Sequence, residues 1–488
     1  MKLLTNAVLN NSTRRLPLLV GLWAFVFYGV TMSRGVTVSS LSLAAKVAGW
    51  DWTPAVGLPL LWLLTLPLRL LPAAWVPLGL NLLSAVTAAL TLGLLARIVQ
   101  LLPWDLPLEN PRRLIGALPV LLACALCGLE FSFWQEATAA TGEMLDLLLL
   151  AAALWLLLEY RVRGKPRWLD AAIFVWGLGM AEDWLQLLAL PLFVAGVIWL
   201  QVETIIAEKP DCTPLSIAAA IWLQRFQTKY FLRLAGLGLA GFSIYALLPL
   251  VNGLAPHSPW SLGQSWHASL KQTKSMLMLL YRQFWSGHQL LTLVLALYFL
   301  VPTLACLVRL RDEGTQDRSQ ADRFQLWIYR GLRVVLLLAC LWLAFDPVTG
   351  PRQIVQRQFG VSLPMLTFDY LNALGACFLA GNLLLISQRH PKTKWRRQAV
   401  LCAAGGLILI IAGLLVRNAP AMLRLNFHTL QSFGELAAGS LPCDRGVMLS
   451  GQPQKLDVFQ AALAHRRNGA DWLAVDTHAL PTVAYRAW

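Results

Sequence analysis

The chain has 488 residues, of which 57% are apolar and only 13% are charged, and it carries 21 Trp. One water-soluble core cannot enclose that much apolar surface, so the composition excludes an ordinary soluble domain and indicates a membrane protein. The net charge of +15 does not indicate a nucleic-acid partner, because Lys and Arg occur in short clusters between apolar runs of membrane-spanning length.

About eleven apolar segments are long enough to cross a bilayer, whose hydrocarbon core of about 30 Å needs about 20 helical residues. The first of them follows Arg14 and Arg15 and lacks a signal-peptide cleavage site, so we expect it to be retained. The predicted spans are 16–33, 75–99, 114–133, 140–159, 168–182, 184–204, 232–252, 289–308, 331–347, 363–387 and 398–416. The sequence therefore predicts an all-α polytopic membrane protein.

The loops between these spans differ strongly in charge. Five of them hold 21 Lys plus Arg, whereas three on the opposite side hold five. The basic loops are 101–113, 161–167, 205–233, 309–333 and 388–397, and the others are 134–142, 253–288 and 348–362. The positive-inside rule places the basic loops and the N-terminus in the cytoplasm.

The segment 34–72 is then an exterior loop. It contains two apolar stretches, 39–48 and 56–71, but the second carries several prolines and Arg69, which disfavour a full crossing. We expect both stretches to be helices lying along the membrane. A second exterior loop covers 253–288.

The composition becomes ordinary after the last span, so we divide the chain into a transmembrane domain, 1–418, and a tail, 419–488. The tail pattern predicts a helix at 421–438, a strand at 446–449, a helix at 455–467 and a strand at 472–475. This small α/β unit is expected outside the cytoplasm, leaning on the spans or on a partner because it can bury little surface alone.

Several stretches of the chain resemble one known family. They are 57–72, 81–90, 131–135, 177–181, 447–488, and Trp260 with Gly263. The family is a bacterial polytopic membrane group related to the animal transmembrane O-mannosyltransferases, within the GT-C glycosyltransferase superfamily.

The resemblance implies a GT-C-like fold in a bacterial inner membrane, with the C-terminus outside the cytoplasm. It implies transfer of a sugar from a polyprenyl phosphate donor to an exterior acceptor, with an acid as general base and cations holding the lipid phosphate. The donor would be the only cofactor-like molecule.

The family's motif carboxylates have changed type in this chain. An acidic motif falls on Ser39 and Ser42, paired acids fall on Ala139 and Thr141, and an Asn-His-His segment falls on 182–184. The expected catalytic motifs are therefore degenerate, and the sequence leaves open whether the chain is an enzyme.

Other exterior acids are candidates for a relocated general base. They are Asp51, Glu143, Glu182 and Asp183, with Glu136 and Asp146 nearby. The alternative is that these acids are solvated turn residues or helix caps.

Candidates for donor binding also lie in the exterior loops. Arg282, Arg352 and Arg357 could hold the lipid phosphate or merely anchor headgroups. Trp260 and Trp266 could stack on a sugar or belong to an interfacial aromatic belt. The His spacing matches no metal motif, so we expect no metal site.

Three functions remain open. The first is a glycosyltransferase that binds membrane lipids and a polyprenyl-phosphate sugar, and the second is an inactive, diverged member that serves as an accessory subunit with other membrane subunits. A transporter is a weaker third alternative, because no inverted repeat is visible.

Overall fold

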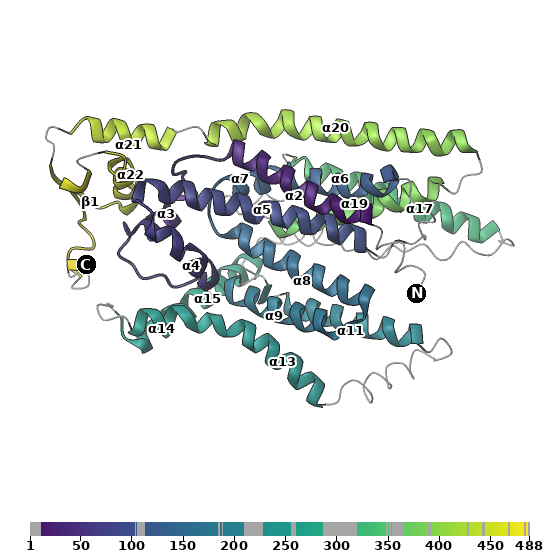
Figure 1. Cartoon of the computed structure of the whole chain (residues 1–488), viewed down its shortest axis with the longest axis horizontal. Coiled ribbons are helices and arrows are strands. Elements are labelled where there is room, and N and C mark those ends of the chain that lie inside the picture. The colour runs from purple at the N-terminus through teal and green to yellow at the C-terminus, as the bar shows by residue number, and fades with distance from the viewer. Residues whose placement is uncertain are drawn as a thin grey trace.

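The computed structural model describes residues 11–102, 104, 113–183, 186–187, 189–208, 228–254, 260–285, 320–347, 350, 353, 366–388, 392–426, 429–441, 445–466, 469–482 and 485–486. Within these residues the chain is mostly helical and has one small sheet near the C-terminus. Most of the helices run along the long axis of the molecule, and the chain end that follows the sheet lies at the opposite end of that axis from the N-terminus (Figure 1).

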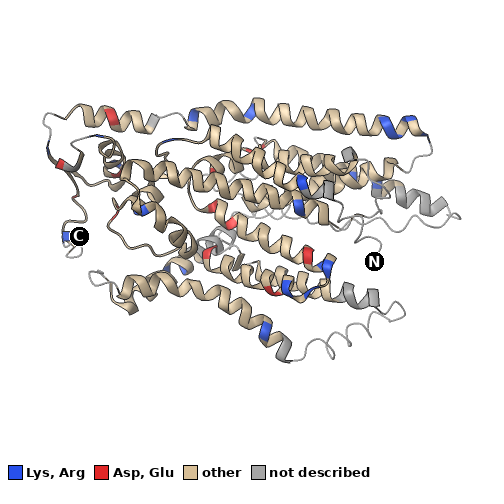
Figure 2. Ribbon diagram, in the orientation of Figure 1, with Lys and Arg blue, Asp and Glu red and all other residues tan. Residues whose placement is uncertain are grey.

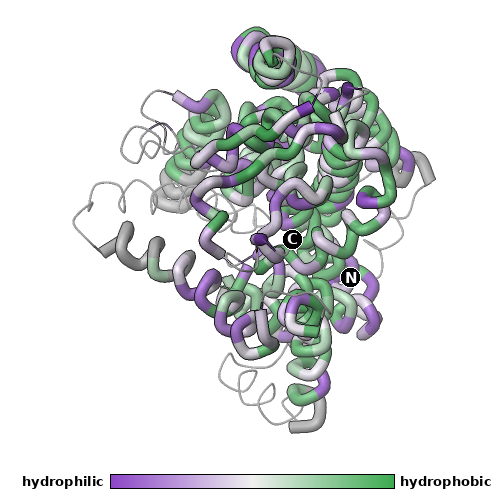
Figure 3. Tube along the Cα trace, turned by 90° about the vertical axis from the view of Figure 1, so that its left-hand side faces the viewer, coloured by the Kyte–Doolittle hydropathy of each residue, from purple (hydrophilic) through white to green (hydrophobic). Residues whose placement is uncertain are grey.

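Long helices, together with the eight-residue helices α7 and α14, form one elongated bundle. They are α2 (Asn11–Thr31), α5 (Val76–Leu101), α6 (Arg113–Gly128), α7 (Phe131–Thr138), α8 (Glu143–Arg163), α9 (Pro166–Glu182), α11 (Leu190–Glu208), α13 (Thr228–Phe242), α14 (Leu247–Leu254), α15 (Leu262–Trp285), α17 (Gln320–Ala344), α19 (Leu366–Gln388) and α20 (Thr393–Asn426). Looking along the bundle, hydrophobic residues predominate on most of these helices, as expected for segments solvated by lipid (Figure 3).

Four helical stretches among the described residues are long and apolar enough to cross a membrane: Ala73–Leu101, Phe231–Leu254, Leu366–Gln388 and Thr393–Gly439. A fifth is added if α6 and α7 count as one span. The structure therefore supports several membrane-spanning helices, whereas the full set of eleven stays a prediction. The predicted span 289–308 lies outside the described residues.

The predicted span 114–133 is not one straight helix. α6 ends at Gly128, and α7 begins at Phe131 after a bend of 69°. Glu130 occupies the N-cap position of α7, where its carboxylate accepts a hydrogen bond from the backbone N–H of Phe133 at 3.4 Å. A side chain at Gly128 would press on Tyr28 and Leu92, so the close packing of α6 at its end favours the break.

Close helix contacts depend on glycine at one crossing in particular. A Cβ at Gly177 of α9 would overlap the backbone of Gly238 in α13, and one at Gly241 would overlap the backbone of Phe174. Small residues that let two backbones approach are typical of helix pairs in membranes.

The segment between α2 and α5 forms short helices, in the two places where the sequence predicts membrane-lying ones. They are α3 (Leu41–Ala48) and α4 (Pro59–Thr65), the latter continued by the 3₁₀ helices η1 (Leu66–Leu70) and η2 (Ala73–Trp75). The buried side chain of Asn81 fixes this segment. It donates to the carbonyls of Ser33 and Gly35 at 2.8 and 3.2 Å, and it accepts from the N–H of Ala140 at 3.0 Å.

The tail contains the predicted strand–helix–strand unit. Strands β1 (Gly446–Ser450) and β2 (Trp472–Asp476) pair in parallel and are connected through α22 (Pro453–Leu463) and the 3₁₀ helix η4 (Gly469–Asp471). The predicted helix 421–438 falls on the end of α20 and on α21 (Thr429–Gly439), and residues 427 and 428 between them lie outside the described part. Val458 and Ala461 of α22 pack in one cluster with residues of α3, so the tail rests on the loop between α2 and α5.

Lys and Arg residues lie at both ends of the bundle, whereas several acidic residues lie where α8 begins and α9 ends (Figure 2). The acidic group is the starting point for the functional site.

Candidate functional site

The turn between α7 and α8 and the end of α9 bring five acids together. Glu136 lies in α7, Glu143 and Asp146 lie in the first turn of α8, Glu182 is the last residue of α9 and Asp183 follows it. The charge of Glu143 interacts with those of Glu136 and Asp183, and the charge of Asp146 interacts with those of Asp183, Glu143 and Glu182. The structure thus places three of the four predicted acids, Glu143, Glu182 and Asp183, in one cluster.

Glycine makes the turn that assembles this cluster. Gly142 has a φ of 107° at the N-cap position of α8, a backbone conformation that favours glycine. A Cβ there would also lie 3.0 Å from the side chain of Leu61 in α4. α8 can therefore begin directly beneath α4, with its first acids facing the end of α9.

Glu182 is engaged by the segment 34–72, the exterior segment of the predicted topology. Its Oε2 accepts a hydrogen bond from the N–H of Leu60, and its Oε1 accepts one from the N–H of Leu61, both at 2.8 Å. These N–H groups belong to the first turn of α4, where an α-helix has no backbone acceptors of its own. Both carboxylate oxygens of Glu182 are thus used to hold α4 against α9.

Glu136 lies against the turn between α7 and α8. Its Oε2 is hydrogen-bonded by the hydroxyl of Thr141, and its backbone carbonyl accepts a hydrogen bond from the hydroxyl of Ser84 at 2.6 Å. Thr141 lies in the turn between α7 and α8, five positions after Glu136. The carboxylate of Glu136 is therefore held against this turn.

The remaining acids differ in access to solvent. Asp146 is buried, and its Oδ1 has no hydrogen-bond partner in the described part of the chain. Glu143 is exposed and Asp183 is half-buried. These two acids are the ones that a molecule approaching from the exterior segment could reach.

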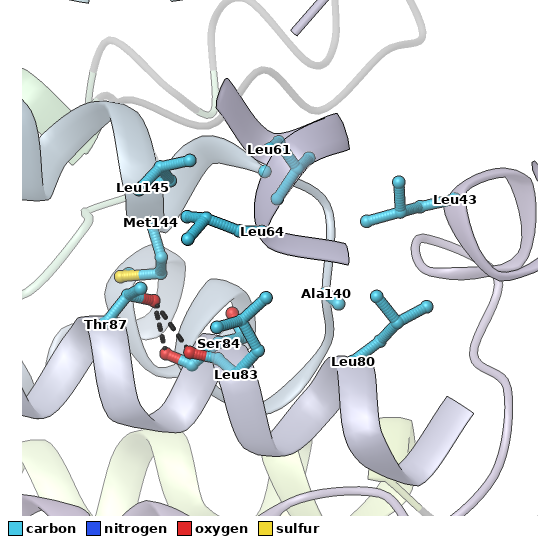
Figure 4. A pocket seen from close by; sticks show the side chains of 11 residues that line it. Leu43, Leu61, Leu64, Leu80, Leu83, Ser84, Thr87, Ala140, Met144 and Leu145 are labelled. Atoms are coloured by element: carbon cyan, nitrogen blue, oxygen red, sulfur yellow. Dashed lines mark hydrogen bonds between the residues drawn. The ribbon is translucent and has the colours of Figure 1, made fainter. Parts of the chain in front are cut away.

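A small pocket lies beside the acids, between α3, α4, α5 and the start of α8. Leucines supply most of its wall, and Ser84 and Thr87 supply hydroxyl groups (Figure 4). The Thr87 hydroxyl donates to the carbonyls of Leu83 and Ser84 in its own helix. With a volume of about 20 Å³, the pocket has room for about one water molecule.

Asp51, the fourth predicted acid, bonds to Thr53 and not to the acid cluster in the described part of the chain. Its Oδ1 accepts hydrogen bonds from the N–H and the hydroxyl of Thr53, at 2.8 and 2.7 Å. Burial, together with the negative charge of Asp51, raises the pKa of Asp457 in α22 to about 6. Asp51 therefore belongs to the contact between the exterior segment and the tail.

The predicted donor-binding residues are only partly described. Trp266 of α15 packs on Tyr245, with ring centroids 6.4 Å apart, and Trp260 is half-buried just before α15. Arg282 lies within α15, but its side chain is outside the described part, as are Arg352 and Arg357 altogether. Stacking on a sugar and binding of a lipid phosphate stay predictions.

Three polar residues of α5 contribute to the site but are not among the site residues predicted from the sequence. Asn81, Ser84 and Thr87 are three residues apart and therefore lie along one side of the helix. A polar stripe of this kind inside an apolar span is the sequence signal that could have identified these three residues.

Within the described ranges, no group of three or more His, Cys, Asp or Glu side chains could hold a metal ion.

One family comparison bears on this site. Residues 44–206 match the family described as Protein O-mannosyl-transferase TMEM260 N-terminal domain. The match covers roughly a third of the chain and includes α4, α5, all five clustered acids and every lining residue of the pocket except Leu43. No curated protein matches the chain. The part that holds the candidate site is thus related to an O-mannosyltransferase family, in line with the resemblance seen in the sequence.

Proposed function

We propose that the chain is a GT-C-like membrane glycosyltransferase that moves a sugar from a polyprenyl phosphate to an acceptor outside the cytoplasm. The observation that carries this proposal is the acid cluster, which lies inside the segment related to O-mannosyltransferases. A reaction that removes a proton from an acceptor hydroxyl needs a carboxylate with access to that hydroxyl.

The membrane topology belongs to the same proposal. Eleven spans with a cytoplasmic N-terminus would put the loop 34–72, the acid cluster and the tail on the exterior side of a bacterial inner membrane. The excess of Lys and Arg in the five loops on one side of the predicted spans, 21 against five, supports this orientation.

The contacts of the acids suggest different roles. Glu143 is the proposed general base, because it is exposed, and Asp183 is its nearest alternative. Glu182 is the proposed positioning residue, since both of its oxygens hold α4. Glu136, with Thr141, would replace the family's acid at the 139–141 turn.

In the proposed reaction the acceptor oxygen forms a bond to the anomeric carbon of the sugar. The bond between that carbon and the phosphate oxygen breaks, the polyprenyl phosphate leaves with the electron pair, and Glu143 takes the hydroxyl proton. Arg282, Arg352 and Arg357 are the proposed partners of the phosphate, and Trp260 and Trp266 those of the sugar ring.

Because the pocket holds only about one water, the segment carrying α3 and α4 would have to move away from α8 to admit a sugar.

The test is sugar transfer in vesicles that contain the purified full-length chain and radiolabelled polyprenyl-phosphate mannose. Glu143→Gln combined with Asp183→Asn should lower transfer at least about 100-fold, as loss of a general base does. Asp170→Asn is the matched control, because Asp170 lies at the other end of α9 and pairs with Arg233. Undiminished transfer by the double variant would refute the assignment.

A second function is favoured by the tail. Val447, Leu449 and Leu473 are 58 to 62% exposed on one side of the two-stranded sheet. Parallel sheets are ordinarily covered on both faces. The alternative proposal is therefore an accessory subunit that binds another membrane subunit through this face.

Gentle extraction of the native protein separates the two functions. An accessory subunit should emerge in a stoichiometric complex that Val447→Glu with Leu473→Glu disrupts. Recovery of the chain without a partner, together with binding of polyprenyl phosphate, would count against the accessory function.

A further inference from the structure

An apolar groove lies at the other end of the bundle from the acid cluster, between α20 and the helices α6, α17 and α19. Its volume is about 300 Å³, which is within the range of small-ligand sites. Along α20 it extends from Ala399 to Ile410, a rise of about 16 Å at 1.5 Å per residue. That length corresponds to one leaflet of a hydrocarbon core about 30 Å thick.

The way in which α20 is attached explains the groove. The second half of α20 is fixed by side-chain amides: Asn418 donates to the carbonyl of Leu129 at 2.8 Å, and Asn426 donates to that of Thr31 at 2.6 Å. The first half turns small residues, Ala399, Ala403 and Gly406, toward α6 and α19. A Cβ at Gly406 would meet nothing within 4 Å, so this half of the helix stands away from its neighbours.

The interior of the groove suits hydrocarbon. Its walls are leucine, alanine, isoleucine and proline side chains, with Leu122 and Leu341 on opposite helices. Ser387, at the end of α19, is the one lining side chain that carries a hydroxyl. A ligand within the groove can therefore gain from burial of CH₂ groups and finds few polar partners.

Cations lie close in the chain to the lining residues at one end of the groove. The side-chain amide of Gln388 donates to the carbonyl of Arg396 at 3.3 Å, which ties the end of α19 to the start of α20. Lys392 and Lys394 are exposed beside this contact. In α17, Arg333 is fully buried one helical turn before the lining residue Leu337. Figure 2 shows the basic residues at this end of α20.

We propose that the groove binds one acyl chain of an anionic phospholipid, whose headgroup lies against Lys392 and Arg396. Such a lipid matches three features of the groove: its length of one leaflet, its apolar walls and the basic residues near one end. Basic pockets between membrane helices bind anionic headgroups. The site is separate from the acid cluster and does not depend on glycosyl transfer. It would stabilise the first half of α20 against the bundle.

Native mass spectrometry of the full chain tests the proposal, with phosphatidylglycerol and phosphatidylcholine as equimolar probes in mild detergent. The wild type should retain one phosphatidylglycerol about 30-fold better than phosphatidylcholine, since each nearby cation contributes about 1 kcal/mol. Lys392→Gln with Arg396→Gln should remove this preference. Ala403→Phe should abolish retention of both lipids, because the ring fills the groove.

The control is Cys402→Phe, which adds a ring on the exposed side of α20 one residue away and should leave lipid binding unchanged. If Ala403→Phe does not fold, Ala399→Leu narrows the groove with a smaller addition. Equal retention of the two lipids, unchanged retention by the groove variants, or a polypeptide helix cross-linked into the groove would each overturn the proposal.

Discussion

The carboxylate of Glu182 accepts a hydrogen bond from the backbone N–H of Leu60 at 2.8 Å, across 122 positions of the chain. The neighbouring N–H, that of Leu61, bonds to the other oxygen. A side chain at the end of α9 thus satisfies the free donors at the beginning of α4, and its negative charge lies at the positive end of that helix. This contact ties the exterior segment to the acid cluster.

Replacing Glu182 should therefore loosen α4. Glu182→Ala leaves two N–H groups without acceptors, one half-buried and one buried, and we expect a loss of about 1–3 kcal/mol in the free energy of unfolding. Glu182→Gln keeps one acceptor oxygen and should lose less. Hydrogen exchange of the α4 amides, together with thermal unfolding in detergent, measures the effect. Unchanged exchange at Leu60 and Leu61 in the Ala variant would contradict this role.

The ion pairs around the buried carboxylate of Glu159, near the end of α8, give a second prediction. The carboxylate of Glu159, 2% exposed, lies 2.7 Å from Arg97 and 2.5 Å from Arg163. Glu159→Gln leaves both guanidinium groups without a counter-charge, and we expect a loss of about 3–5 kcal/mol. The control, Asp170→Asn, removes a pair whose Arg233 is mostly exposed and should cost at most about 1 kcal/mol. Equal unfolding midpoints for the two variants would refute the prediction.

The close crossing of α9 and α13 should depend on glycine at position 241. Gly241→Ala forces a methyl group against the backbone of Phe174, which should cost about 1–3 kcal/mol. Gly236→Ala is the control in the same helix, because a Cβ there meets nothing within 4 Å. The control should be neutral or more stable, since alanine favours a helix over glycine by up to about 1 kcal/mol. Thermal unfolding of both variants makes the comparison.

The tail should bind more firmly to the exterior segment at acid pH. The pKa of Asp457 is about 6 in the folded chain, against about 3.9 for an unperturbed Asp. Between these pH values the folded chain binds more protons than the unfolded chain, so its stability falls as the pH rises. Unfolding midpoints at pH 4.5 and pH 7 measure this slope.

Two variants separate the causes of that slope. Asp457→Asn removes the titrating group and should flatten the dependence of stability on pH. Asp51→Asn removes the neighbouring negative charge, so the pKa of Asp457 should fall and the loss of stability should begin at a lower pH. The Asn side chain keeps the Oδ1 that accepts from Thr53. A slope of the same size in Asp457→Asn would show that another group is responsible.

The sequence predicts features of this molecule that arise locally. Apolar length predicts the spans, and the alternation of short strand and helix patterns predicts β1, α22 and β2. Contacts between distant residues leave no such pattern: nothing near Glu182 points to Leu60, and nothing near Glu159 points to Arg97, 62 positions away. The pattern of apolar residues does not predict the break between α6 and α7 either, and there Gly128 contacts Tyr28, 100 positions away in the chain.

Asn81 is the residue whose loss should affect the candidate site most without touching an acid. Its buried amide bonds to Ser33, Gly35 and Ala140, so it holds the exterior segment and the 139–141 turn on the same helix. Asn81→Leu leaves these backbone groups unpaired, and we expect a loss of about 1–3 kcal/mol together with faster hydrogen exchange between residues 34 and 49.

The control for Asn81 is Thr91→Val in the same helix, because the hydroxyl of Thr91 donates to the carbonyl of Thr87 within α5. It should cost less than about 1 kcal/mol and leave exchange in 34–49 unchanged. If Asn81→Leu likewise leaves that exchange unchanged, the exterior segment is held by other contacts. Sugar transfer should fall in Asn81→Leu and stay normal in Thr91→Val, because the 139–141 turn sets the position of Glu143 through Gly142.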